Sequence, residues 1–189
     1  MTKGFVNGGR KFVAVGAAIA LLGASAGNAN GGESAVKRAA CNDAGAAAVN
    51  VSPKKLNKAI LCLVNQERTK RGLKALRSNK KLAKAAKKHT KQMVKTNCLD
   101  HQCGGEPNLQ GRIRGYLSGA RQYAYGEDVG CATTAAKMVS RWMGSPLHRA
   151  NILNKKFKDA GVGSSQGRVS SRCSKNYATF TIVFGFRKG

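Results

Sequence analysis

The chain is expected to fold as one α+β domain, because helical patterns precede a strand pattern and the length suits a single core. Apolar residues recur with the helical period over 52–72, 79–95 and 133–143. The run 178–186 alternates with period two and is rich in β-branched and aromatic residues, which together with Val162 favours an antiparallel hairpin or meander. Helices before strands are typical of the α+β class. About 160 residues bury enough surface for one core without disulfides.

The N-terminus has the order of a secretory signal peptide. Three basic residues precede an apolar run over 12–22, and small residues follow it. We expect residues 1–26 to be removed by cleavage after Ala26, with Ala29 as the alternative site. The apolar run falls short of the ~20 residues that span a bilayer, and no later segment is longer. The sequence therefore predicts a secreted protein with no transmembrane segment in its mature form.

A leader is expected before the folded domain. Residues 27–51 are rich in Gly, Ala, Asn and Ser without an apolar period, which predicts a flexible segment ahead of a domain over 52–189. The first helix begins there, since Ser52 can cap it, Pro53 suits its first turn and Gly72 offers a stop.

The second helix, over 79–95, separates apolar from basic residues. Its expected inner face holds Leu82, Ala85, Ala86, His89 and Met93, and its outer face holds Lys80, Lys84, Lys87, Lys88, Lys91 and Lys95. The lysine row is either a solvated face or a docking surface for a phosphate-bearing polymer or a membrane. No aromatic residues interleave with it, as a binder of single-stranded nucleic acid would need. On the apolar side, His89 is interpreted as a core residue with satisfied ring nitrogens.

The middle of the chain is expected to be a Gly- and Pro-containing loop over 97–112 with a short helical turn at 112–117. The third helix, 133–143, turns a set of apolar residues inward: Ala135, Met138, Val139, Trp142 and Met143.

All six cysteines lie in the exported part, and an even number in an oxidising compartment indicates three disulfides. Fifteen pairings are possible. Chain topology favours Cys98 with Cys103 across a tight turn, Cys41 with Cys62, and Cys131 with Cys173. The alternative makes Cys98, His101 and Cys103 metal ligands, but no second Cys/His pair lies nearby to complete a tetrahedral site.

The formal net charge of +26 indicates attraction to polyanions through a long-range field that salt weakens. Nucleic acid, anionic lipid headgroups and acidic wall polymers all fit this charge. No motif specific for nucleic acid is present. Charge alone therefore indicates a class of partner without identifying one.

Three strings resemble the secreted CAP superfamily, also called the SCP or YkwD-like domain. They are Ser-Pro-Leu-His-Arg-Ala-Asn-Ile-Leu at 145–153 after Trp142, Gly-Glu-Asp at 126–128, and Leu-Asp-His at 99–101. The resemblance covers about residues 56–186 and implies an α-β-α sandwich with a large cleft. The family supports several unrelated activities, so the resemblance indicates fold and site better than substrate.

The resemblance also implies a candidate site made of His101, Glu127 and His148. The fourth family position falls on Ser145, where many eukaryotic members have a second glutamate. Two imidazoles and a carboxylate are ligands that zinc uses when one position stays open, so zinc or another divalent cation is a candidate cofactor. In the alternative interpretation, His148 and Glu127 hydrogen-bond each other and hold loops over the cleft.

The sequence also predicts roles for three residues close to these candidates, Asp128, Arg149 and Asn151. Asp128 replaces the usual asparagine, and its charge beside Glu127 is expected to raise the proton affinity of either carboxylate. Arg149 is expected to pair with Glu127 or Asp128, and Asn151 to satisfy loop backbone groups.

Enzymatic activity is left open by the sequence, with binding favoured. As a nucleophile, Ser145 lacks the Gly-x-Ser-x-Gly surroundings, and a serine before proline is more simply a helix-ending or capping residue. A lysozyme-like pair of carboxylates is not indicated, because Glu67 is expected to pair with Arg71 one helical turn later.

We therefore expect a secreted binding module for a small apolar or amphipathic ligand, such as a lipid or a sterol-like molecule, or for an envelope component. The first alternative is a metal-assisted or serine-type hydrolase of peptide or ester bonds. The second is a general polyanion binder.

Overall fold

The centre of the protein is a four-stranded sheet with the strand order β1-β3-β4-β2. The computed structural model describes residues 40–167, 169 and 173–189, so the expected signal peptide and most of the leader lie outside the described residues. The described elements are η1 (Ala48–Asn50), α1 (Pro53–Thr69), β1 (Arg77–Ser78), α2 (Lys80–Thr96), α3 (Leu109–Arg112), α4 (Arg114–Leu117), β2 (Gln122–Ala132), α5 (Ala135–Gly144), α6 (Pro146–Ile152), β3 (Asp159–Gln166) and β4 (Ala178–Lys188).

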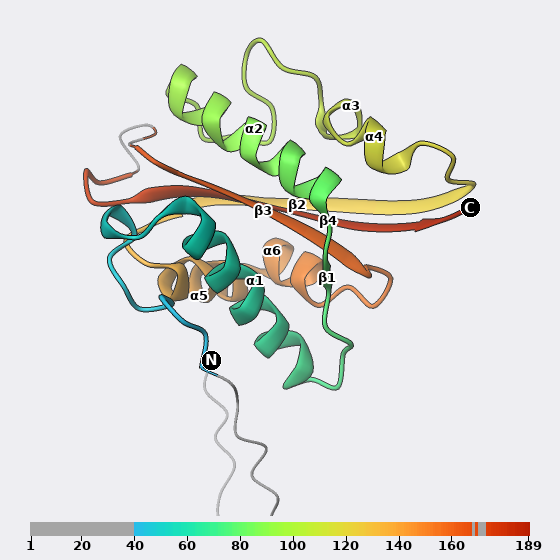
Figure 1. The fold of residues 1–189 in the computed structure, drawn as a ribbon, viewed down its shortest axis with the longest axis horizontal. Coiled ribbons are helices and arrows are strands. Elements are labelled where there is room, and N and C mark those ends of the chain that lie inside the picture. Colours follow the sequence, from blue (N-terminus) through green and yellow to red (C-terminus); the bar gives the residue numbers. More distant parts are fainter. Residues whose placement is uncertain (1–39, 168, 170–172) are drawn as a thin grey trace, which may run out of the picture. The chain divides into compact units, whose positions relative to one another are not determined.

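Helices cover both faces of the sheet (Figure 1). On one face, α2 packs against β3 and β4. On the other, α1 contacts β3 while α5 and α6 contact β2. These layers confirm the α+β class and the α-β-α sandwich. The expected antiparallel pairing is found in the longer strands, and at one edge the two-residue β1 pairs in parallel with β3. The remaining pairs, β3 with β4 and β2 with β4, are antiparallel.

The expected helices lie where their patterns place them. The first follows Ser52, whose side chain makes no capping hydrogen bond, and carries Pro53 in its first turn. The second is capped by Asn79, whose side chain accepts from the N–H groups of Lys81 and Leu82. In the motif at 145–153, Pro146 begins a separate short helix, α6, which the sequence patterns did not predict. Among the described helices, none has the length and apolarity needed to cross a membrane.

Strand β2 has no counterpart in the sequence-based expectations, because glycines and acidic residues interrupt its apolar alternation. Its register with β4 places Glu127 opposite Val183 and Asp128 opposite Ile182. Successive residues of a strand point to opposite faces. Val129, two residues after Glu127, packs in the cluster around Met93 of α2, whereas a Cβ on Gly130 would meet Met138 of α5. The two acidic side chains are therefore separated by the sheet.

Two glycines of β3 let α2 approach the sheet closely. A Cβ on Gly161 would lie 2.0 Å from the backbone nitrogen of Ala83, and a Cβ on Gly163 would lie 2.5 Å from the carbonyl carbon of Ala86. Neither position can therefore carry a side chain without displacing α2. This close packing fixes the helix whose outer face carries the lysine row.

The packed part of the chain extends further toward the N-terminus than the expected start at Ser52. Ala48 and Val51 are buried in the main core cluster. The backbone N–H of Ala48 donates to the carbonyl of Thr133 at 2.8 Å, and the side chain of Gln166 donates to the carbonyl of Val49 at 2.8 Å. These contacts attach the last residues of the expected leader to the domain.

Candidate functional site

All three disulfides favoured by chain topology are present: Cys41–Cys62, Cys98–Cys103 and Cys131–Cys173. The alternative in which Cys98, His101 and Cys103 hold a metal ion is therefore wrong, because both sulfurs are bonded to each other. The Cys98–Cys103 bridge closes a small loop at the end of α2. His101 lies within that loop, and Glu106 follows it in the chain.

His89 is confirmed as a core residue with satisfied ring nitrogens. Its side chain is fully buried on the sheet side of α2. Nδ1 lies 2.7 Å from Oε1 of Glu106, and Nε2 lies 3.0 Å from the carbonyl oxygen of Asp100. The same Glu106 oxygen accepts the backbone N–H of Cys103 at 2.9 Å. Both nitrogens of His89 thus lie within hydrogen-bond distance of an oxygen atom.

Glu127 is the centre of the site, with none of its side chain exposed. Arg112 donates to it twice, from Nη1 to Oε2 at 2.8 Å and from Nη2 to Oε1 at 3.0 Å. Nδ1 of His101 lies 3.1 Å from Oε1. Such bidentate guanidinium–carboxylate pairs are strong and directional. Both carboxylate oxygens are therefore engaged by the protein itself.

These contacts set the protonation of the pair. Burial raises the pKa of Glu127, but the hydrogen bonds from His101 and Arg112 outweigh it, so the pKa lies below its usual value. The pKa of His101 is raised, chiefly by its hydrogen bond to Glu127. With 56% of its side chain exposed, His101 connects this buried network to solvent.

Arg112 links the network to its surroundings. Its Nη2 also donates to the carbonyl of His101 at 2.7 Å, and its Nε lies 3.8 Å from Oε2 of Glu106. The buried Nε has no hydrogen-bond partner among the described residues. Glu106 and Glu127 thus stand on either side of one guanidinium. Mutual pairing of this kind offsets the cost of removing each charge from water.

Asp128 lies on the other face of β2 and contacts α6. Its Oδ1 accepts from Nδ2 of Asn151 at 2.7 Å, and the same amide donates to the carbonyl of Glu127 at 3.2 Å. Burial raises the pKa of Asp128 to about 7. The expected rise in proton affinity is thus found for Asp128, chiefly from burial, whereas the pKa of Glu127 moves the other way. Asn151 does satisfy a backbone group, as expected.

Other expected partners are not found. Arg149 donates to the carbonyl of Met143 at 3.2 Å rather than to Glu127 or Asp128, because it points back along the α5–α6 junction. The alternative interpretation predicts a hydrogen bond between His148 and Glu127, and no such bond forms among the described residues. Arg112 and His101 contact the Glu127 carboxylate instead. Burial lowers the pKa of His148, with a further contribution from the charge of His101.

Two expectations about polar residues agree with the structure. Ser145 ends α5 and immediately precedes α6, which is the helix-ending role favoured over that of a nucleophile. Glu67 pairs with Arg71 at 2.7 Å and also with Lys70 at 2.7 Å. Glu67 thus has the structural role assigned to it.

A metal site does not follow from this arrangement. No group of three His, Cys, Asp or Glu side chains in the described part of the chain is placed to hold a metal ion. His101 and Glu127 are in contact, but a guanidinium already neutralises the carboxylate. The divalent-cation site therefore stays a prediction, and the side chains as they stand do not fit it.

A groove of about 520 Å³ opens between α2 and residues 105–114. Ala85 and Pro107 give it apolar surface. Five of its lining residues are basic: Lys88, Lys91, Lys95, Arg112 and Arg114. The candidate residues His101, Glu127, His148 and Ser145 do not line it. We call this hollow the α2 groove.

The roles of Arg112 and Glu106 were not foreseen. Neither stands in a recognisable string, and they are 15 and 21 residues before Glu127. Burial is the property that marks them, with Arg112 only 4% exposed at its side chain. Burial of this kind cannot be seen in a segment whose composition is that of a loop.

The geometry agrees with comparisons to known proteins. The model of the cysteine-rich secretory protein (CAP) family matches residues 61–184. The chain belongs to this family. It is similar to the uncharacterized protein YkwD of Bacillus subtilis (strain 168), with 36% identity over 110 residues, which is 56% of this chain and 41% of that protein. The chain thus spans less than half of that relative.

Solved structures share the fold. An outer surface protein from Borrelia burgdorferi matches with a TM-score of 0.62 and 21% identity over 73% of this chain and 97% of that one. An extracellular protein containing an SCP domain from Bacillus anthracis str. Ames matches with a TM-score of 0.56 and 25% identity, over 73% of this chain and 44% of that one.

Proposed function

We propose that this protein is a secreted CAP-domain binding module that holds an anionic amphipathic ligand in the α2 groove without turning it over. Three disulfides support an oxidising compartment, as does the signal-peptide order of the N-terminal residues. Two similar proteins are described as extracellular and as an outer surface protein. The ligand would be an envelope lipid or a molecule of similar chemistry.

The observation that carries this proposal is the lining of the α2 groove. Basic side chains converge there from both α2 and residues 105–114, while Ala85 and Pro107 supply apolar contact. Lysine and arginine also bring long aliphatic stems, which pack against apolar groups while the charged end stays hydrated. A ligand with a short apolar part and an anionic headgroup satisfies both kinds of surface.

Binding without turnover is favoured by the engagement of the acidic groups. A general base needs a lone pair that is free to accept a proton from the reacting group. Glu127 is held through both oxygens by Arg112 and His101, whereas Glu106 contacts His89 and the backbone N–H of Cys103 through Oε1 and has its Oε2 3.8 Å from Nε of Arg112. Both carboxylates thus serve to fix the wall of the groove.

The wall is rigid enough for binding because several contacts hold it independently. The Cys98–Cys103 disulfide closes its first loop. The side chain of Gln92 donates to the carbonyl of Gly104, and Asn108 caps α3 by accepting from the N–H of Gly111. A preformed wall lowers the ordering cost of binding.

The test is a calorimetric titration with dodecyl phosphate below its micellar concentration. We expect the double variant Lys95→Gln/Arg114→Gln to bind about tenfold more weakly, since two charge-assisted contacts are lost. The matched variant Lys80→Gln/Lys84→Gln loses the same charge outside the groove and should keep its affinity within about twofold. Equal weakening in both variants, or binding of dodecanol as tightly as of dodecyl phosphate, would overturn the proposal.

A further inference from the structure

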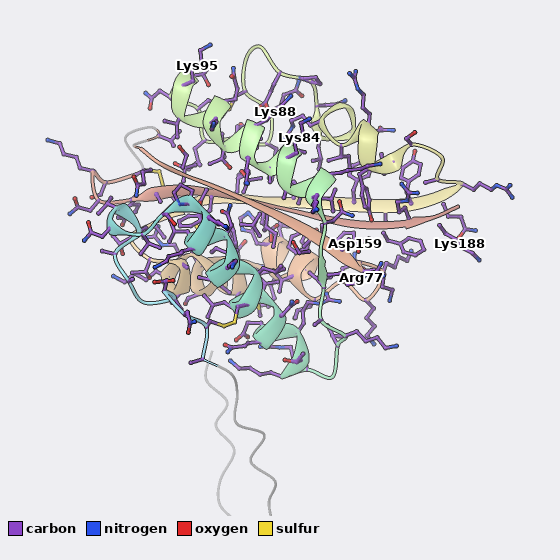
Figure 2. The ribbon with its side chains drawn as sticks, in the orientation of Figure 1. Arg77, Lys84, Lys88, Lys95, Asp159 and Lys188 are labelled. Carbon is purple, nitrogen blue, oxygen red and sulfur yellow. A yellow bond between two sulfur atoms is a disulfide. The ribbon has the colours of Figure 1, made fainter. Side chains whose placement is uncertain are left out.

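The outer face of α2 carries an unusually dense row of positive charge. The helix has 17 residues, contains no Asp or Glu, and includes seven lysines: Lys80, Lys81, Lys84, Lys87, Lys88, Lys91 and Lys95. All seven are exposed. No carboxylate among the described residues forms an ion pair with any of them. Figure 2 shows Lys84, Lys88 and Lys95 in succession along the helix.

This row works against the stability of its own helix. Like charges four residues apart repel, and α2 places such pairs at 80/84, 84/88, 87/91 and 91/95. Lysines at the N-terminal end also oppose the helix dipole. At the end of α1, in contrast, Glu67 pairs with Lys70 and Arg71. A local arrangement that opposes the fold in this way is a common sign of function.

The lysines line two neighbouring hollows. Beside the α2 groove lies a second hollow of about 360 Å³, lined by Ala83 and five lysines: Lys80, Lys84, Lys87, Lys88 and Lys91. Lys88 and Lys91 belong to both hollows. From Lys80 to Lys95 the row extends about 22 Å at the α-helical rise per residue. We call this surface the α2 track.

We infer that the α2 track binds a linear, base-free phosphodiester polymer of the cell envelope along the length of the helix. Flexible lysines with compact ammonium groups suit successive phosphates that have no fixed register, whereas bidentate recognition would call for arginine. The inference goes beyond the proposed function, because Lys80, Lys84 and Lys87 do not line the α2 groove.

Other polyanions fit the track less well. A stacking platform for single-stranded nucleic acid needs aromatic side chains, and α2 has none. Insertion into a membrane needs exposed apolar side chains beside the basic ones. The exposed large hydrophobic residues of the described part are Val49, Tyr123 and Leu147, none of which lies on α2. A base-free polymer needs neither feature.

The experiment measures binding of poly(glycerol phosphate) of defined length at several salt concentrations. The variant is Lys80→Gln/Lys84→Gln/Lys87→Gln, and the matched control is Lys54→Gln/Lys55→Gln/Lys58→Gln on α1, where the lysines are also exposed. We expect the α2 variant to bind at least tenfold more weakly at low salt. Its plot of log affinity against log salt should be less steep by about 2, because three phosphate contacts are lost.

The control should keep its affinity within about threefold. Equal losses in the two triple variants would overturn the inference in favour of diffuse attraction. Tighter binding of an oligothymidylate with the same number of phosphates would overturn it in favour of nucleic acid, and tighter binding to phosphatidylglycerol vesicles in favour of a membrane. Dodecyl phosphate binding by the α2 variant stays unchanged if the groove proposal holds, so the two proposals fail separately.

Discussion

Arg112 holds Glu127 through two hydrogen bonds of 2.8 and 3.0 Å beneath the wall of the α2 groove. The pair joins the segment after the Cys98–Cys103 loop to the edge strand β2. Because Arg112 also lines the groove, the buried carboxylate fixes the position of a residue in the groove wall. If the α2 groove binds a ligand as proposed, Glu127 acts there as a positioning residue.

Replacing Glu127 by glutamine should destabilise the protein by about 3 kcal/mol or more, because it leaves the buried guanidinium of Arg112 without its counter-charge. Chemical denaturation measures the change in the free energy of unfolding. The matched change Glu67→Gln breaks a more exposed pair and should cost under about 1 kcal/mol. A similar decrease in the free energy of unfolding in the two variants would show that burial does not make the Arg112–Glu127 pair more important for stability than an exposed pair.

His101 and His148 should have pKa values on opposite sides of the usual value of 6.5. The pKa of His101 is raised by its hydrogen bond to Glu127, and the pKa of His148 is lowered by burial. NMR of the imidazole protons, assigned with His101→Gln and His148→Gln, measures both values. A His148 that titrates at higher pH than His101 would contradict the geometry.

The raised pKa of His101 determines how its contribution to stability changes with pH. A histidine whose pKa is higher in the folded state binds its proton more tightly there. The stabilisation from the His101–Glu127 contact is therefore fully present below pH 6.5 and is lost as the pH rises through the folded-state pKa of His101. The variant His101→Gln should lack this part of the pH dependence.

Asp128 should make the protein less stable as the pH rises from about 4 to 7. Its pKa is raised by burial from 3.8 to about 7, so the folded state binds the proton more tightly than the unfolded state does. The stabilisation from protonated Asp128 is fully present below about pH 4. It is lost as the pH rises through this window, and the loss lowers the free energy of unfolding by roughly 4 kcal/mol at most.

The variant Asp128→Asn should remove that slope. The asparagine keeps a side-chain oxygen that can accept from Nδ2 of Asn151, and it carries no charge. Its own NH2 group would take the place of Oδ2 of Asp128, which has no hydrogen-bond partner among the described residues. We expect the variant to be more stable than the original by about 1–3 kcal/mol at pH 8 and to show little gain at pH 5. Denaturation at both pH values tests this, and an equal gain at both would exclude titration of Asp128 as the cause.

The sequence predicts much of the fold because its clearest local patterns agree with the tertiary packing. The apolar faces of α1, α2 and α5 and the alternation of β4 are local properties that tertiary contacts reinforce. Strand β2 was missed for the opposite reason. Its stability comes from pairing along its whole length with β4 and from buried ionic contacts, neither of which leaves a periodic apolar signal.

The candidate site was predictable only through the family resemblance, and only in part. His101 and Glu127 meet across 26 residues, a separation that carries no signal by itself. The partners that decide the chemistry, Arg112 and Glu106, come from a segment with loop composition. Long-range pairing of buried charges depends on three-dimensional placement, which no local pattern encodes.

Zinc should not bind at a single saturable site in the oxidised protein. The arrangement of His101 and Glu127 resembles part of a ligand set, but displacement of Arg112 by a metal ion would leave its buried guanidinium without the carboxylate that binds it through two hydrogen bonds. Calorimetry of the original protein and of His101→Ala/His148→Ala, with folding checked by circular dichroism, should give indistinguishable traces. Binding of one zinc ion that vanishes in the double variant would instead establish the metal site and would make screening for hydrolysis of peptide and ester bonds worthwhile.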